Sequence, residues 1–328
     1  MSLHTLITKS AIAYMFTRLL LLTLTLTLSW QTHASQQCET VKLGIVNWTD
    51  VQVTTAVAQA LLESLNYDVK VSTHSVDGIY QNLSQGKLDA FLGNWMPTMA
   101  PIIKPFEEQN TIETLGVNLE GAKYTLAVPT YVYDAGVKTF ADLVRFKKNF
   151  GGRIYGLEKG NDGNLIIQKM IDSNKFGLGK FRLMATSENI MLAQVKKRVH
   201  ENQWIAFLAW APHPMNKQFD IRYLAGGDDF FGPNYGGSTV NTNVRTGLGK
   251  ECPNVQRLLS NLKFDLAMEA SMMDQVINQF VPAKRAARSW MHNNPEQVKT
   301  WLNGITTRQG KPADAKKIAK DMKLSFSH

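Results

Sequence analysis

The sequence lacks the motifs that mark most enzymes and metalloproteins. It contains no G-x-S-x-G nucleophile motif, no H-E-x-x-H zinc pair and no G-x-x-x-x-G-K-[ST] phosphate loop. Its seven histidines form no cluster with the spacing of metal ligands. We therefore expect no catalytic residues, no metal site and no cofactor.

Long apolar runs are also missing. The best candidate, Leu19 to Leu28, is too short and too interrupted by threonine to stay in a membrane as a spanning helix. It follows Lys9 and Arg18 and precedes a small-residue cleavage site ending at Ala34. This pattern predicts a signal peptide over residues 1–34, and hence export to the periplasm as a protein without a lipid anchor.

Charge of one sign is in excess, since the net charge is +9. The lysines and arginines are scattered along the chain, which is typical of a solvated surface, and we expect no nucleic-acid partner.

Cysteine is scarce. In an oxidising compartment the two cysteines, Cys38 and Cys252, favour a disulfide over two buried free thiols.

Strand-like and helix-like segments alternate along most of the chain. The predicted strands are 41–46, 69–73, 88–92, 125–128, 153–156, 205–209 and 221–224. The predicted helices are 53–65, 165–171 and 190–199, followed after Gly249 by 255–262, 266–280, 283–291 and 295–302. This β-α alternation predicts an α/β fold with a largely parallel sheet.

The chain crosses between two such sets at two places. The first crossing lies around 116–123, and the glycine-rich stretch 231–238 returns. We predict two discontinuous α/β lobes joined by a hinge: lobe one from 35–118 plus 238–328, with the C-terminal helices, and lobe two from 119–237. A hinge between two lobes creates a cleft that can close on a ligand.

Three tryptophans, Trp48, Trp95 and Trp210, each follow an apolar run of strand length. Any one of them is more often a core residue, but the repetition favours a ligand wall, because ligands of open α/β sheets bind beyond the carboxyl ends of the strands. Asp50 lies two residues after Trp48. Aromatic faces with a carboxylate predict a small organic cation as ligand.

Two further residues lie near the predicted cleft. Asn161, in Gly160-Asn161-Asp162-Gly163, is typical of a helix N-cap and would stand at the cleft's mouth. His213 lies between two prolines after Trp210, and we interpret it as a rigid turn residue at the strand's end rather than as a general base.

Several of these segments together resemble one family. The stretches are 46–50, 86–97, 123–124, 160–163 and 208–213. They are similar to the choline-binding periplasmic component of ABC transporters, in the wider glycine betaine and choline binding-protein family. The resemblance covers nearly all of the chain after residue 34 and is weakest beyond Gly310.

The resemblance implies a bilobed Venus-flytrap fold of the type II-like kind and an aromatic box around a trimethylammonium group. In this sequence the box maps onto Trp48 and Trp95 from lobe one and onto Tyr124 and Trp210 from lobe two. Asp50 and Asn161 match residues at the head and hydroxyl ends of the ligand, and Cys38 and Cys252 match a lobe-one disulfide.

The function implied is that of a monomeric receptor, not an enzyme, that binds choline, with acetylcholine as a further ligand, and delivers it to a membrane permease. A receptor for glycine betaine or another quaternary amine is an alternative within the same class. A periplasmic esterase for quaternary amines is an alternative from another class, and it would need a nucleophile and a base that no motif in the sequence supplies.

Overall fold

The computed structural model describes residues 38–323. The predicted signal peptide, 1–34, lies outside the described residues. Cys38 and Cys252 are both disulfide-bonded, which confirms that the chain carries a disulfide. Between residues 38 and 323 no helix has the length and apolar character needed to cross a membrane.

The body formed from Thr40 onward is built on one nine-stranded sheet, whose strands are ordered β2-β1-β3-β9-β4-β7-β5-β6, with β8 paired to β4. The strands are β1 (Thr40–Ile45), β2 (Asp68–Thr73), β3 (Ala90–Met96), β4 (Ile112–Pro129), β5 (Arg153–Gly156), β6 (Arg182–Ala185), β7 (Phe207–Ala211), β8 (Ile221–Tyr223) and β9 (Gly237–Arg245).

The sheet is mixed, so the prediction of a largely parallel sheet was wrong. β1 pairs in parallel with β2 and β3, and β5 pairs in parallel with β6 and β7. β9, however, lies antiparallel between β3 and β4, and β4 is antiparallel to β7 and β8. β9 escaped prediction because its two valines stand four positions apart among small polar residues, so it shows neither an apolar run nor strict alternation.

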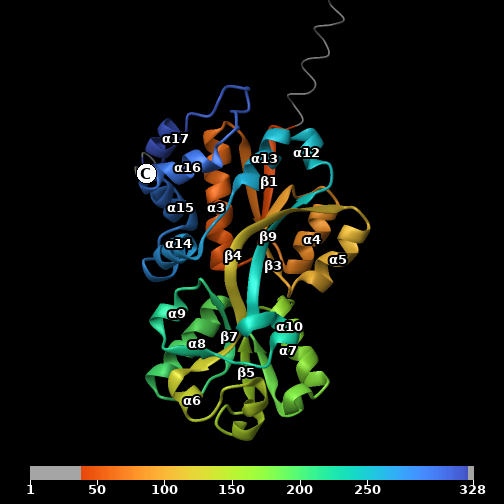
Figure 1. Ribbon diagram of the computed structural model, residues 1–328, viewed down its shortest axis with the longest axis vertical. Helices are drawn as coiled ribbons and strands as arrows, with labels where there is room; N and C mark the ends of the chain where they lie inside the picture. The colour runs from red at the N-terminus through yellow and green to blue at the C-terminus, as the bar shows by residue number, and fades with distance from the viewer. Residues whose placement is uncertain (1–37, 324–328) are drawn as a thin grey trace, which may run out of the picture. The chain divides into compact units, whose positions relative to one another are not determined.

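β4 and β9 run side by side between two α/β groups of elements (Figure 1). We call the group with β1 to β3 the first lobe and the group with β5 to β8 the second lobe. The bilobed α/β fold is as predicted. The predicted lobe boundaries fall inside β4, at 118/119, and at the start of β9, at 237/238, and they stay a prediction.

Helices surround the sheet. Those before β9 are α3 (Thr49–Ser64), α4 (Val76–Ser84), α5 (Ala100–Glu108), α6 (Thr130–Asp134), α7 (Asp162–Asp172), α8 (Glu188–His200), α9 (Met215–Gln218), α10 (Asp228–Phe231) and α11 (Pro233–Gly236), with 3-10 helices η1 (Phe140–Phe146) and η2 (Lys175–Lys180). Those after β9 are α12 (Leu248–Glu251), α13 (Pro253–Asn261), α14 (Leu266–Asn278), α15 (Ala283–Asn293), α16 (Pro295–Trp301) and α17 (Ala315–Asp321).

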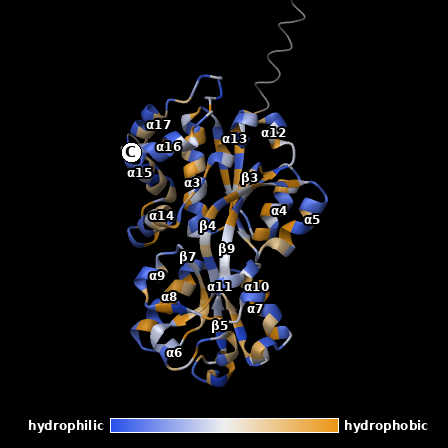
Figure 2. Cartoon of the chain, in the orientation of Figure 1, coloured by the Kyte–Doolittle hydropathy of each residue, from blue (hydrophilic) through white to orange (hydrophobic). Residues whose placement is uncertain are grey.

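α3 is a long helix, and most of its residues are buried. It packs against β1, β2 and β3 and also against α14 and α15, so apolar residues are needed around most of its circumference. Val53, Val57 and Leu61 are fully buried. Figure 2 shows apolar residues gathered inside each lobe, where strands and helices meet, whereas β9 between the lobes is largely white and blue. α3 therefore forms a rigid base for the residues at its N-terminus.

Candidate ligand-binding site

One cavity collects the residues that the sequence singled out. It is lined by Trp48, Asp50, Trp95, Tyr124, Leu157, Asn161 and Trp210. The six residues predicted as ligand contacts thus lie around a single space, and each is buried. Leu157 adds an apolar wall residue that the sequence alone did not suggest.

The elements explain these positions. Trp48 is the residue before the first turn of α3, and Asp50 lies in that turn. Trp95 and Trp210 are the next-to-last residues of β3 and β7. The sequence suggested that these tryptophans follow the strands, but in the structure they are still part of them. Tyr124 of β4 is paired directly with Trp210 across the sheet.

The aromatic rings form walls at steep angles to each other. The Trp95 and Tyr124 ring centroids are 5.8 Å apart with planes at 57°, and those of Tyr124 and Trp210 are 6.5 Å apart at 88°. The Trp48 indole N–H donates to the Glu158 carboxylate at 2.8 Å, which fixes the orientation of this fourth ring. Rings held in this way enclose a space in place of stacking on one another.

Two polar atoms of the cavity have no hydrogen-bond partner within the described part of the chain. Asp50 Oδ2 accepts a hydrogen bond from the Trp95 indole at 3.0 Å, but Oδ1 is buried and accepts none. The Trp210 indole N–H is likewise buried and donates to no acceptor. Buried polar groups are nearly always paired, so an unpaired acceptor and an unpaired donor in one cavity are positions at which a ligand's polar groups can bind.

The Asn161 side chain forms its hydrogen bonds with other residues of the protein. As predicted, it caps α7, accepting a hydrogen bond from the Asn164 backbone N–H at 2.9 Å. The same oxygen accepts from the Tyr124 hydroxyl at 3.0 Å, and the amide group donates to Asp162. Burial raises the pKa of Tyr124 well above its usual range, so the phenol stays protonated and keeps donating. Asn161 therefore orients Tyr124.

Asp50 in the cavity lining, and further acids near it, have no cationic partners among residues 38–323. Burial, with the nearby Glu188 charge, raises the pKa of Asp50 to about 7, and burial raises the pKa of Asp162 to about 6. Burial, followed by the charge of Asp50, also raises the pKa of Glu269. Over residues 38–323 none of these acids, nor Glu158, forms an ion pair with lysine or arginine.

At pH 7 a pKa of about 6 leaves Asp162 mostly ionised and a pKa of about 7 leaves Asp50 about half ionised, so negative charge lies at the cavity, which suits a cation and opposes an anion. Glu158, Glu188 and Glu269 were missed by sequence reasoning. Each is a single glutamate far from the tryptophans in sequence, and Glu188 in the first turn of α8 has the simpler interpretation of an acid at a helix N-terminus.

His213 occupies the turn after β7, as predicted. Its Nδ1 accepts a hydrogen bond from the Met215 backbone N–H at 2.9 Å, and its ring lies edge-on to Trp210 with centroids 4.6 Å apart. Its Nε2 lies 3.3 Å from Glu188 Oε1, a contact that sequence reasoning did not anticipate. The His213 ring therefore packs against Trp210 and helps to hold this indole in place.

Two lobes bridged by paired strands, with a closed aromatic cavity supplied by both, define a substrate-binding protein of the periplasmic type II-like fold. The chain belongs to the family described as the substrate binding domain of ABC-type glycine betaine transport systems, which matches residues 39–293. The family is thus one of substrate-binding domains that serve ABC-type transport.

Solved structures agree with this assignment. An ABC-transporter choline binding protein in complex with choline is 44% identical, with a TM-score of 0.84 over 87% of this chain and 98% of that one. An unliganded, semi-closed structure of an ABC-transporter choline binding protein is 45% identical, with a TM-score of 0.80 over 87% of this chain and 99% of that one.

A transport protein from Listeria monocytogenes is a more distant relative. This glycine betaine/carnitine transport binding protein is 26% identical over 186 residues, which are 56% of this chain and 61% of the relative. The chain thus spans somewhat less than two thirds of that protein's length.

Proposed function

We propose that this protein is a receptor that encloses choline in the cavity between its lobes and delivers it to the permease of an ABC importer. The observation that carries the proposal is the convergence of four aromatic side chains and one buried carboxylate, Asp50, on one closed space, with Asp50 Oδ1 lacking a partner among residues 38–323. The likeness to a protein solved with choline supports it. We also propose that the receptor works as a monomer in the periplasm.

A trimethylammonium group fits this environment for a chemical reason. It has no N–H donor, so hydrogen bonds cannot hold it, and its charge is spread over methyl groups that gain little from water. Each cation-π contact contributes about 0.5 to 2 kcal/mol, so four faces supply up to roughly 8 kcal/mol, close to the free energy of a micromolar complex. Burial and Asp50 offset the cost of closure.

Asp50 favours choline among the quaternary amines. Its unpaired Oδ1 can accept a hydrogen bond from the hydroxyl group of choline, whereas the carboxylate of glycine betaine would bring a second negative charge. Two like charges about 4 Å apart cost on the order of 4 kcal/mol at an effective dielectric constant of 20. We infer that choline binds more tightly than glycine betaine.

A glycine betaine or carnitine receptor is the second candidate. The family description and the Listeria relative favour it, and the unpaired Trp210 indole N–H could donate to a ligand carboxylate. The acids around the cavity weigh against it. A quaternary-amine esterase is the candidate from another class, and release of choline from acetylcholine by the pure protein would support it.

Calorimetric titration separates these candidates. The purified protein, 35–328, is titrated with choline, acetylcholine, glycine betaine and carnitine. We expect micromolar or tighter binding of choline and at least tenfold weaker binding of glycine betaine. Tighter binding of glycine betaine than of choline would contradict the proposed specificity, and turnover of acetylcholine would contradict the receptor class.

A further inference from the structure

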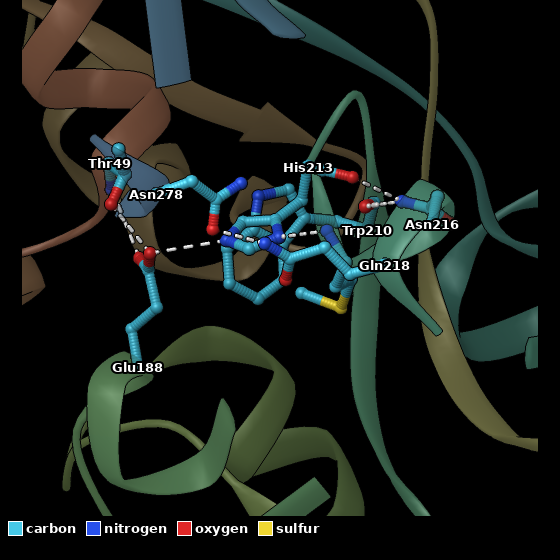
Figure 3. Close-up of polar contacts among 8 residues, drawn as sticks. Thr49, Glu188, Trp210, His213, Asn216, Gln218 and Asn278 are labelled. Carbon is cyan, nitrogen blue, oxygen red and sulfur yellow. Dashed lines mark hydrogen bonds and ion pairs between the residues drawn. The ribbon is translucent and has the colours of Figure 1, made fainter. Parts of the chain in front are cut away.

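One buried carboxylate joins the two lobes beside the cavity. Glu188, on α8 of the second lobe, accepts two hydrogen bonds from Thr49, on α3 of the first lobe (Figure 3). Its Oε2 accepts from the Thr49 backbone N–H at 3.0 Å, and its Oε1 accepts from the Thr49 hydroxyl at 2.6 Å. Both residues are nearly inaccessible to solvent, at 6% and 3% exposure.

This contact completes a helix end that the first lobe leaves unfinished. The first amide groups of an α-helix have no intrahelical acceptor and normally receive one from a capping side chain. Trp48 occupies the N-cap position of α3 and supplies no side-chain cap. The carboxylate of Glu188, which belongs to the second lobe, caps α3 instead. The positive end of the α3 dipole also favours the negative charge of this carboxylate.

Glu188 also reaches the aromatic wall of its own lobe. His213 Nδ1 accepts a hydrogen bond from Met215, so the network assigns the ring proton to Nε2, which faces Glu188 Oε1 at 3.3 Å. His213 in turn packs against Trp210. On the other side, Thr49 lies between Trp48 and Asp50 in the sequence. A continuous polar link therefore connects the two halves of the ligand wall.

We propose that Glu188 is a positioning residue that fastens the closed form, through Thr49 and His213, and so controls how fast the ligand leaves. The inference rests on the proposed function, because it concerns the release of the same quaternary ammonium ligand. The hydrogen bonds form only when the two lobes meet, so closure creates them and ligand release must break them.

A second link between the lobes gives a natural comparison. At the rim, the Gln218 side chain donates to the Asn278 side chain, and this contact is solvent-exposed (Figure 3). Exposed hydrogen bonds contribute little because water replaces them, whereas buried bonds to a carboxylate contribute more. We therefore assign the kinetic role to Glu188 and Thr49 and not to the rim pair.

The test is stopped-flow binding of choline, followed by tryptophan fluorescence. Thr49→Val removes the hydroxyl donor without changing charge or size. We expect its dissociation rate to rise about 10- to 100-fold, with the association rate within about threefold of the wild type. Thr49→Ser keeps the hydroxyl and should restore slow release, and Asn278→Ala should change the rate less than threefold.

Glu188→Gln and the double variant complete the cycle. Because Thr49 and Glu188 act through one contact, the double variant should release choline hardly faster than Glu188→Gln alone. Thr139→Val, which removes a comparable threonine-aspartate contact within the second lobe, should lower the melting temperature and leave release unchanged. Unchanged release in Thr49→Val, or fully additive effects, would overturn the proposal.

Failure of the proposed function gives a different result. If calorimetry shows that the wild type binds none of the quaternary amines, the receptor assignment fails while the contact can still be tested. Amide hydrogen exchange at Thr49 then decides, measured with the lobes held closed by a disulfide between Gln218→Cys and Asn278→Cys, whose native side chains meet at the rim. At least tenfold faster exchange in Glu188→Gln than in the wild type would support the fastening contact, and equal exchange would overturn it.

Discussion

Asp50 shows how one side chain can shape the chemistry of the cavity. It is held by the Trp95 indole, faces the charge of Glu188, and has one oxygen free of partners in the described chain. An uncompensated acid in such a place lowers stability, and proteins tolerate this cost chiefly where a ligand removes it. A bound cation would stabilise the ionised form of Asp50.

The affinity for choline should therefore depend on pH. Burial, with the Glu188 charge second, raises the pKa of Asp50 to about 7, so the carboxyl is ionised above this value and protonated below it. A cation prefers the ionised form. We expect choline affinity to fall as pH falls from 8 to 5, by up to about tenfold per unit below pH 7.

Calorimetry in a series of buffers measures this effect, and Asp50→Asn is the control. Its affinity should be lower at pH 8 and much less dependent on pH. A wild-type affinity for choline that stays constant between pH 8 and pH 5 would remove the ionisation of Asp50 from the binding mechanism.

Trp210 offers a second side chain with a matched control. Trp210→Ala removes one aromatic wall, and we expect choline affinity to fall by at least tenfold, from the loss of a cation-π contact and of the enclosing surface. Trp204→Ala removes an indole that packs on Phe146 and Phe150 away from the cavity. It should lower the melting temperature while the calorimetric affinity stays within about threefold of the wild type.

Equal losses of affinity in the Trp210 and Trp204 variants would mean that the Trp210 indole acts through the general stability of the fold.

The sequence allowed Trp210, Trp48 and Trp95 to be singled out because each follows an apolar strand. Glu188 could not be found in this way, because its partner Thr49 is 139 positions away and only folding brings them together.

The start of α7 illustrates what a helix contributes to the site. A Cβ atom on Gly163 would lie 2.3 Å from the Tyr124 hydroxyl, so only glycine lets this phenol approach the helix and reach Asn161. The sequence predicted the turn and the cap at 160–164. It could not show that the glycine serves a tyrosine on another strand.

Gly163→Ala should therefore displace Tyr124 from the cavity wall. We expect about tenfold or greater loss of choline affinity in calorimetry, with the helix content unchanged by circular dichroism. Gly78→Ala in α4 is the control, since its Cβ would meet the Ser75 hydroxyl at 3.1 Å and the His74 Cβ at 3.4 Å, and no cavity residue. An unaffected Gly163→Ala variant would show that the ring tolerates displacement.

Strands and helices differ in how well the sequence defined them. The periodicity placed α3, α7 and α8 within a few residues, and it placed the helices after Gly249 similarly well. β9, β6, α4 and α5 were missed. These are short or polar segments whose structure depends on neighbours, such as the flanking β3 and β4 that pair with β9 along its length.

At the scale of the whole molecule, the binding site is divided between the two lobes. Trp48, Asp50 and Trp95 come from the first lobe, while Asn161 and Trp210 come from the second. An open form would hold only part of the box, so a ligand that touches both parts shifts the population toward closure by its differential affinity. β4 and β9, which run between the lobes, are the elements that must bend.

The bilobed architecture could be predicted because β-α alternation occurs twice and glycine-rich crossings separate the two sets. The mixed pairing of the central strands could not, since antiparallel β9 carries no distinctive pattern. Nor could the buried carboxylates be predicted as a group, because their charges add up only in three dimensions.

The most direct test compares choline with its neutral isostere, 3,3-dimethylbutan-1-ol, by calorimetric titration of the same protein. The two molecules share shape and hydroxyl group and differ in the positive charge. If aromatic faces and buried acids bind an onium head, choline should bind with micromolar or better affinity and the isostere at least 100-fold more weakly. Equal affinities would contradict a site built for a cation.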